Sequence, residues 1–152
     1  MSTTCLYILA DGPEEIAVIR RHYDGYPEIG GVALSRVLQR LGESHGGPDC
    51  LAASVVASFK DGPLCFGLLP SGTRDTGEEF RYLIDLGSKD LTVQTEKEFY
   101  DPDLGSTWGA SSLAPASCPG RELAGEILKR SAHAREYWDH FDKEQELKEA
   151  AK

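Results

Sequence analysis

The sequence predicts an α+β domain: an antiparallel sheet with an N-terminal hairpin, helices packed over one face, and a long C-terminal helix. Three observations predict this class. Two runs of strand character flank a Gly-Pro turn near the start, apolar residues with a helical repeat follow, and a longer helical repeat comes last. We expect residues 1–143 to form a single domain and residues 144–152 to be a charged, frayed tail.

The first half of the chain is expected to form the hairpin and two helices. Residues 3–9 and 15–22 have strand character and are joined by a tight turn at residues 11–13. One apolar stripe at helical spacing follows, formed by Leu34, Val37, Leu38 and Leu41. Residues 49–59 predict a second helix, although their adjacent valines also permit a strand.

The second half is expected to add three strands and the longest helix. Residues 65–69, 80–85 and 91–95 predict the strands. Residues 101–120 are rich in Gly, Ser, Pro and Ala, and are interpreted as an ordered excursion or a mobile loop. From residue 121 to about 141 a heptad-like repeat predicts one continuous helix. Its small central residues suit packing against the sheet or against a second copy of the chain.

Composition limits the classes of function. The 152 residues carry a net charge of −9, which argues against binding of long nucleic acid. No apolar run reaches the length of a membrane span. The first residues have neither a basic region nor a long apolar segment, so we expect no signal peptide and a cytoplasmic location. Acidic residues concentrate at 71–103, whereas residues 120–135 carry more basic than acidic side chains.

The sequence does not indicate metal or cofactor chemistry. The four cysteines form no Cys-x-x-Cys pair and are interpreted as free thiols, with Cys5 in the core. His133 and His140 are seven residues apart, too far for the usual i, i+4 metal pair. Neither a Gly-rich phosphate motif nor a Gly-x-Ser-x-Gly elbow occurs. We therefore expect no catalytic residues, no metal and no cofactor.

Residues 20–31 gather many groups that could contact a ligand. Two cations, a histidine, two tyrosines and three glycines lie within these twelve residues. Strand alternation places Arg20 and Arg21 on opposite faces of the sheet. A tight turn at Gly25 is expected to hold the preceding side chains, and the last two glycines to open a helix whose N–H groups favour anions. The alternative is a plain helix entry with an Asp turn and packed tyrosines.

The order His22-Tyr23-Asp24-Gly25-Tyr26-Pro27, after a strand near the N-terminus, resembles the His-Trp-Asp-Gly-Tyr-Pro signature of a group of small phage and prophage proteins. Tyr23 stands where that signature usually has Trp, and the resemblance covers residues 3–41. The chain is thereby similar to the anti-Thoeris phage sponge proteins. This likeness implies a non-enzymatic oligomer that binds cyclic ADP-ribose-type signals or cyclic oligonucleotides and so silences a bacterial TIR-based defence in the host cell.

Such a ligand needs cations for its phosphates, flat rings for its base, and amide donors. The segment supplies a set of candidates: Arg21, His22, Tyr23, Asp24 and Gly25. Tyr23 is the first choice for base stacking, and Tyr82 with Phe80 adds further rings.

The C-terminal helix supplies a second set of candidates. Lys129 and His133 are spaced i, i+4 with Arg130 beside them, which could neutralise phosphates. The alternative is a solvated face supported by a Glu126–Arg130 pair.

Two tryptophans have different interpretations. Trp108, in the Gly-rich stretch, is either a lid over a pocket or a contact between the loop and the core. Trp138 continues the apolar stripe of the last helix and is expected to be buried.

Three functions remain open from the sequence. The first is sequestration of a small cyclic nucleotide by a homo-oligomer. The second is a nucleotide-processing enzyme that uses His22 or His133 as an acid or base. The third is a protein–protein inhibitor whose acidic surface around residues 71–103 covers a basic partner.

Overall fold

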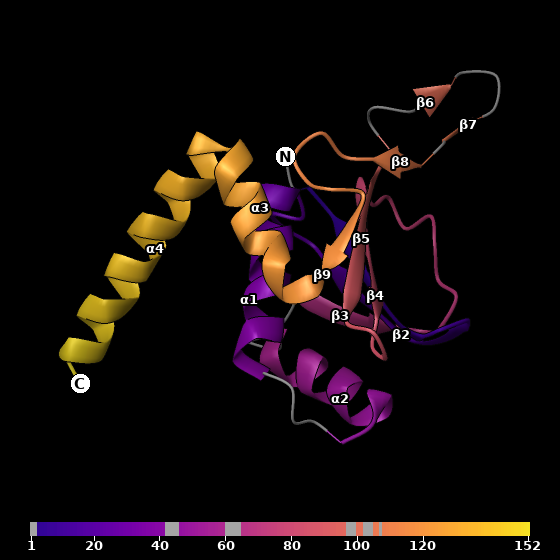
Figure 1. Ribbon diagram of the computed structural model, residues 1–152, viewed down its shortest axis with the longest axis horizontal. Coiled ribbons are helices and arrows are strands. Elements are labelled where there is room, and N and C mark those ends of the chain that lie inside the picture. Colours follow the sequence, from indigo (N-terminus) through magenta and orange to yellow (C-terminus); the bar gives the residue numbers. More distant parts are fainter. Residues whose placement is uncertain (1–2, 42–45, 60–64, 97–99, 102–104, 107) are drawn as a thin grey trace.

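A seven-stranded sheet with helices over one face forms the centre of the molecule (Figure 1). The computed structural model describes residues 3–41, 46–59, 65–96, 100–101, 105–106 and 108–152. The strands follow the order β3-β2-β1-β4-β5-β8, and β9 also pairs with β5. Their bounds are β1 Cys5–Asp11, β2 Glu14–Arg21, β3 Phe66–Leu69, β4 Phe80–Asp85, β5 Asp90–Thr95, β8 Gly109–Ala110 and β9 Ser117–Pro119. A separate short pair consists of β6 Tyr100–Asp101 and β7 Gly105–Ser106.

The predicted α+β class, the N-terminal hairpin and the long C-terminal helix are confirmed, and the sheet is antiparallel with one exception. Strands β1 and β4 are parallel, with Cys5 opposite Phe80. The two strands start at the same end of the sheet, where the Glu79 amide donates to the Thr4 carbonyl at 2.9 Å. The alternation of apolar residues identifies a strand without giving its direction. The sequence pattern therefore could not reveal this parallel pairing.

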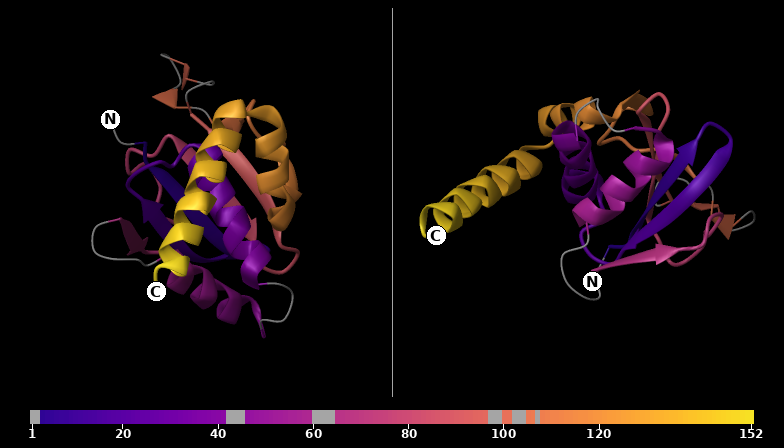
Figure 2. Two further views of the ribbon diagram at one scale, coloured as in Figure 1. Left: turned by 90° about the vertical axis from the view of Figure 1, so that its left-hand side faces the viewer. Right: turned by 90° about the horizontal axis from the view of Figure 1, so that it is seen from below.

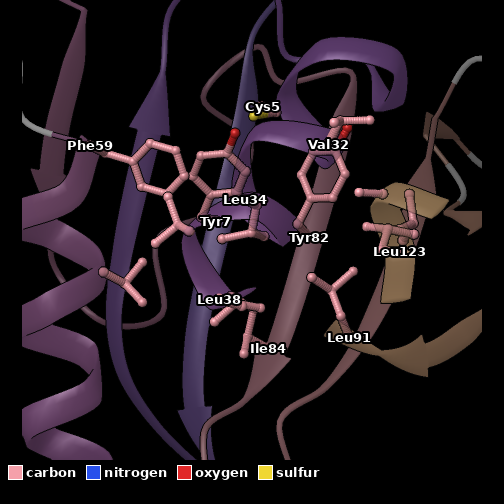
Figure 3. Packing of buried hydrophobic residues seen from close by; sticks show 14 of the residues in the cluster. Cys5, Tyr7, Val32, Leu34, Leu38, Phe59, Tyr82, Ile84, Leu91 and Leu123 are labelled. Atoms are coloured by element: carbon pink, nitrogen blue, oxygen red, sulfur yellow. The ribbon is translucent and has the colours of Figure 1, made fainter. Parts of the chain in front are cut away.

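The helices lie on the side of the sheet that receives the odd-numbered side chains of β1. They are η1 Pro27–Gly31, α1 Val32–Leu41, α2 Pro48–Phe59, η2 Gly120–Glu122, α3 Leu123–Arg130 and α4 Ala132–Ala150. Figure 3 shows Tyr7 and Tyr82 from the sheet packed among Leu34 of α1, Phe59 of α2 and Leu123 of α3. This is the principal core, and burial of such side chains is the main stabilising contribution to the fold.

A smaller apolar cluster lies on the other face of the sheet. Leu6, Ile8 and Val18 form it. The loop between β3 and β4 is held beside it, because Arg20 donates to the Thr76 carbonyl at 3.1 Å. Arg20 and Arg21 thus lie on opposite faces, as the alternation of β2 predicts.

The C-terminal helical segment is two helices, so the prediction of one continuous helix over residues 121–141 is wrong. Ser131 has an extended backbone, with φ −130° and ψ 113°, between α3 and α4. Its hydroxyl accepts from the Ala134 amide at 3.1 Å and donates to Glu28 at 2.9 Å. Serine is favoured at this N-cap position, and the capped start gives α4 its own direction. The guanidinium of Arg135 donates to the Leu128 carbonyl at the end of α3.

Helix α4 projects away from the sheet in Figure 1 and in the right-hand view of Figure 2. It continues to Ala150, so most of the expected charged tail is helical. Trp138 is buried, as expected from its place in the apolar stripe, and its indole N–H donates to the Glu28 carbonyl at 2.8 Å. None of the helices in the described part of the chain is long and apolar enough to cross a membrane.

Candidate functional site

The Asp-Gly turn of the signature is built into the core. The Gly25 amide donates to the Thr3 carbonyl at 2.8 Å, and the Tyr82 hydroxyl donates to the Gly25 carbonyl at 2.7 Å. A Cβ at Gly25 would lie 2.7 Å from the Cβ of Cys5. Tyr82 has 0% exposure. Gly25 and Tyr82 therefore cannot contact a ligand, and their sequence-based assignment as binding residues is corrected to a structural role.

The glycines after the signature do not present free amides. The helical segment begins at Pro27 rather than at Gly30, and the Gly30 amide donates to the Tyr26 carbonyl at 2.8 Å. The Gly30 carbonyl accepts from the buried Tyr7 hydroxyl at 2.6 Å. A Cβ at Gly31 would lie 3.1 Å from both Tyr82 and Ile127. Close packing, not anion binding, explains these glycines, so the predicted anion site at this helix start is wrong.

The polar residues of the signature lie at the surface. The Tyr23 side chain is 57% exposed, and its ring centroid is 6.4 Å from that of His22. Asp24 is exposed and has a positive φ of 56°, which aspartate tolerates in turns. Arg21 stabilises this turn, because its Nε donates a hydrogen bond to the Tyr23 carbonyl at 2.7 Å.

The candidates near the C-terminus are exposed on α3 and α4. Lys129 and Arg130 are exposed and pair with the same carboxylate, that of Glu126, at 3.3 and 3.7 Å. His133 is exposed on α4, and the break at Ser131 removes its expected i, i+4 relation to Lys129. This arrangement agrees with the alternative interpretation, a solvent-exposed helix face on which Glu126 pairs with Arg130.

A cleft of about 450 Å³ lies between α1 and α4. This volume is in the range of small-molecule pockets. Of the sequence-derived candidates, only Arg21 is among its lining residues. The cleft is lined by residues of β2, η1, α1, α2, β3 and α4: Arg21, Ile29, Ala33, Arg36, Val37, Gln39, Arg40, Ser58, Phe59, Phe66, Tyr137, Trp138 and Phe141.

Three arginines give the cleft its positive charge. The Arg21 guanidinium lies 5.2 Å from the Phe66 ring centroid, within cation–π range. The Arg36 guanidinium lies 4.7 Å from the Trp138 ring and pairs with Asp142 at 2.7 Å. Arg40 follows Arg36 by one turn of α1 and is exposed. Cations from two elements therefore face one cavity.

Aromatic rings form two walls of the cleft. On the side of α2 and β3, Phe59 and Phe66 have ring centroids 5.2 Å apart. On α4, the Tyr137 and Phe141 rings are nearly parallel at 6.3 Å, and Trp138 meets Phe141 edge-on at 5.2 Å. Such surfaces stack on planar rings.

The hydroxyl of Tyr137 is a neutral donor at physiological pH. Burial, and then the nearby charge of Asp24, raises the pKa of Tyr137 above its ordinary value. Asp24 of the signature turn therefore lies close enough to Tyr137, a lining residue of the cleft, to influence its pKa. Tyr137 thus adds a hydrogen-bond donor beside the arginines.

Trp108 has a structural contact away from the cleft. Its ring lies 3.8 Å from the guanidinium of Arg81, which also pairs with the buried Glu78 at 2.9 Å. The interpretation of Trp108 as a contact that positions its loop is favoured over a lid. Within the described ranges, no group of three His, Cys, Asp or Glu side chains could hold a metal ion.

The sequence did not single out Arg36 and Arg40. The available signal was two arginines at i, i+4 beside the apolar stripe of α1. Arg36 and Arg40 line a cleft because α4, about 100 residues later in the chain, packs beside α1 and contributes its aromatic side chains to the same cleft.

In comparisons with known proteins, no family model, no curated protein and no solved structure matches the chain.

Proposed function

We propose that the protein binds and sequesters a small cyclic nucleotide, of the cyclic ADP-ribose type or a cyclic oligonucleotide, without converting it. The observation that carries the proposal is the cleft of about 450 Å³ in which three arginines face aromatic rings. Guanidinium groups bind phosphate oxygens through paired N–H donors. A base stacked on an aromatic side chain contributes about 1–3 kcal/mol.

In this proposal the residues of the cleft have different roles. Arg36 and Arg40, one turn apart on α1, contact a phosphate group of the ligand. Tyr137 and Phe141 on α4 offer faces for a base. Arg21 and Ile29, which lie on either side of the signature residues 22–27, are two of the lining residues of this cleft.

The resemblance of residues 22–27 to the phage sponge signature adds the biological context to this proposal. Sequestration would silence a defence signal in the cytoplasm of a bacterial host. Assembly into a homo-oligomer is part of the same proposal.

Thermal melting with a panel of cyclic ADP-ribose isomers, cyclic dinucleotides and cyclic trinucleotides tests the proposal. A ligand at 100 times its dissociation constant should stabilise the folded state by about 2.7 kcal/mol. Arg40→Gln should weaken binding about tenfold, since it removes a charged hydrogen-bond donor. Arg130→Gln is the matched control, because Arg130 is equally charged and lies outside the cleft.

Three results would contradict the proposal in different ways. Conversion of the nucleotide, measured by chromatography after denaturation, would instead support the enzyme. Loss of binding in Arg130→Gln but not in Arg40→Gln would place the ligand at the end of α3. The absence of a thermal shift with the whole panel would favour the acidic protein inhibitor.

A further inference from the structure

Two residues of α4 contact the Arg36 guanidinium. The guanidinium donates to the Asp142 carboxylate at 2.7 Å and lies 4.7 Å from the Trp138 ring. The two contacts use different parts of the group: a carboxylate meets the N–H edge, whereas the ring meets the flat face. Asp142 accepts from Nη2 of Arg36, one of the nitrogens through which a guanidinium forms paired hydrogen bonds to a phosphate.

We propose that Asp142 is an internal competitor for the phosphate of the ligand, so that binding exchanges the Arg36–Asp142 pair for an Arg36–phosphate pair. This inference rests on the proposed function and assigns Asp142 the role of setting ligand affinity. Arg36 keeps its contact with Trp138 during the exchange, and this contact holds the guanidinium in position for the phosphate.

The pair is suited to exchange because water reaches both partners. The Arg36 and Asp142 side chains are 36% and 48% exposed. Ion pairs of this exposure change an equilibrium by a factor of about 1.4 to 5. The phosphates of the proposed ligands each carry one negative charge, as the Asp142 carboxylate does, and such a group can replace a partner held this weakly.

The exchange also releases part of α4. Near its start, α4 is held to Glu28 by Ser131 and by the Trp138 indole N–H. The Arg36–Asp142 pair is the contact to α1 that lies one turn further along the helix. Residues 143–150 beyond it are exposed, so ligand binding should leave this last part of α4 without its connection to α1.

The test compares two substitutions on α4 that remove the same charge. Asp142→Asn removes the competitor and keeps the side-chain shape. Asp139→Asn is the matched control, since Asp139 is exposed and pairs with Lys143 of its own helix at 2.8 Å. Titration calorimetry measures the dissociation constants of cyclic ADP-ribose and cyclic di-AMP, one probe of each class, for both variants and the wild type.

We expect Asp142→Asn to tighten binding of the recognised probe about two- to five-fold, and Asp139→Asn to change it by less than about 1.5-fold. Weaker binding by Asp142→Asn would overturn the inference, because Asp142 would then position Arg36. Equal effects of the two variants would also overturn it, because only the net charge would matter. Binding of neither probe by any of the three proteins would overturn the proposed function together with the inference.

Hydrogen exchange of the same proteins without ligand gives an independent readout. Amides of residues 143–150 should exchange faster in Asp142→Asn than in Asp139→Asn, because only the first substitution removes the contact with α1. Identical exchange in the two variants would overturn the inference while leaving the proposed function in place.

Discussion

Gly25 lies too close to β1 to accept a side chain, and its replacement by alanine should destabilise the protein by about 3 kcal/mol. The new Cβ would lie 2.7 Å from the Cys5 backbone nitrogen and 2.9 Å from the Thr4 carbonyl carbon. These are main-chain atoms at the start of the central strand β1, so relief requires movement of the strand or of the turn.

The magnitude follows from two contributions. Overpacking of this kind costs about 1–3 kcal/mol. Movement of the turn also weakens two hydrogen bonds, from the Gly25 amide to Thr3 and from the Tyr82 hydroxyl to Gly25. Each contributes about 0.5–1.5 kcal/mol. For a chain of this length, a loss of about 3 kcal/mol lowers the melting temperature by about 6–12 °C.

Urea denaturation followed by tryptophan fluorescence measures the change, with Gly125→Ala as the control. A Cβ at Gly125 meets nothing within 4 Å, and this glycine lies within α3. Alanine there should stabilise the protein by about 1 kcal/mol. If Gly25→Ala stayed within about 0.5 kcal/mol of the wild type, the close packing of the signature on β1 would be refuted.

Three further outcomes follow from buried groups. Tyr82→Phe leaves the Gly25 carbonyl without its donor, so urea denaturation should show a loss of about 1–3 kcal/mol, with nucleotide affinity unchanged. Burial raises the pKa of Cys5 to about 12, so mass spectrometry after alkylation of the native protein should find exposed Cys50 modified and Cys5 intact. Burial alone would raise the pKa of Glu78, but hydrogen bonds from backbone amides and an arginine outweigh it and lower this pKa. Its stabilisation is therefore present at neutral pH and lost as the pH falls through the folded-state pKa, so Glu78→Gln should cost about 2–3 kcal/mol at pH 7. In urea titrations this cost should decrease as the pH is lowered below the ordinary pKa of glutamate.

Local patterns predicted the elements of the fold and little of their arrangement. The hairpin, α1, α2 and the pair β4–β5 follow from turn residues and apolar spacing within short windows. The break at Ser131 was missed because the apolar repeat continues across it, while the hydrogen bond that favours the break comes from Glu28, about 100 residues earlier.

The candidate site was the least predictable part. The signature predicted that Tyr23 and Gly25 bind a ligand. Tyr23 is exposed and Gly25 is packed against β1, and the sequence alone does not reveal this difference in burial. Arg21 was identified because it adjoins the signature. In the sequence, Arg36 and Arg40 are indistinguishable from other polar residues of an amphipathic helix. Their place in the cleft depends on the packing of α4 beside α1.

The parallel pairing of β1 with β4 has a consequence for synthesis of the protein in the cell. A ribosome adds about 5–20 residues per second, so roughly 4–15 s separate the emergence of β1 from that of β4. During that interval the β1–β2 hairpin can form, but the edge of β1 that later binds β4 stays open. An open apolar edge pairs readily with other chains. The nascent chain is therefore most prone to aggregation before residue 85 has emerged, and a chaperone that binds extended apolar segments should raise the yield of folded protein most during this interval.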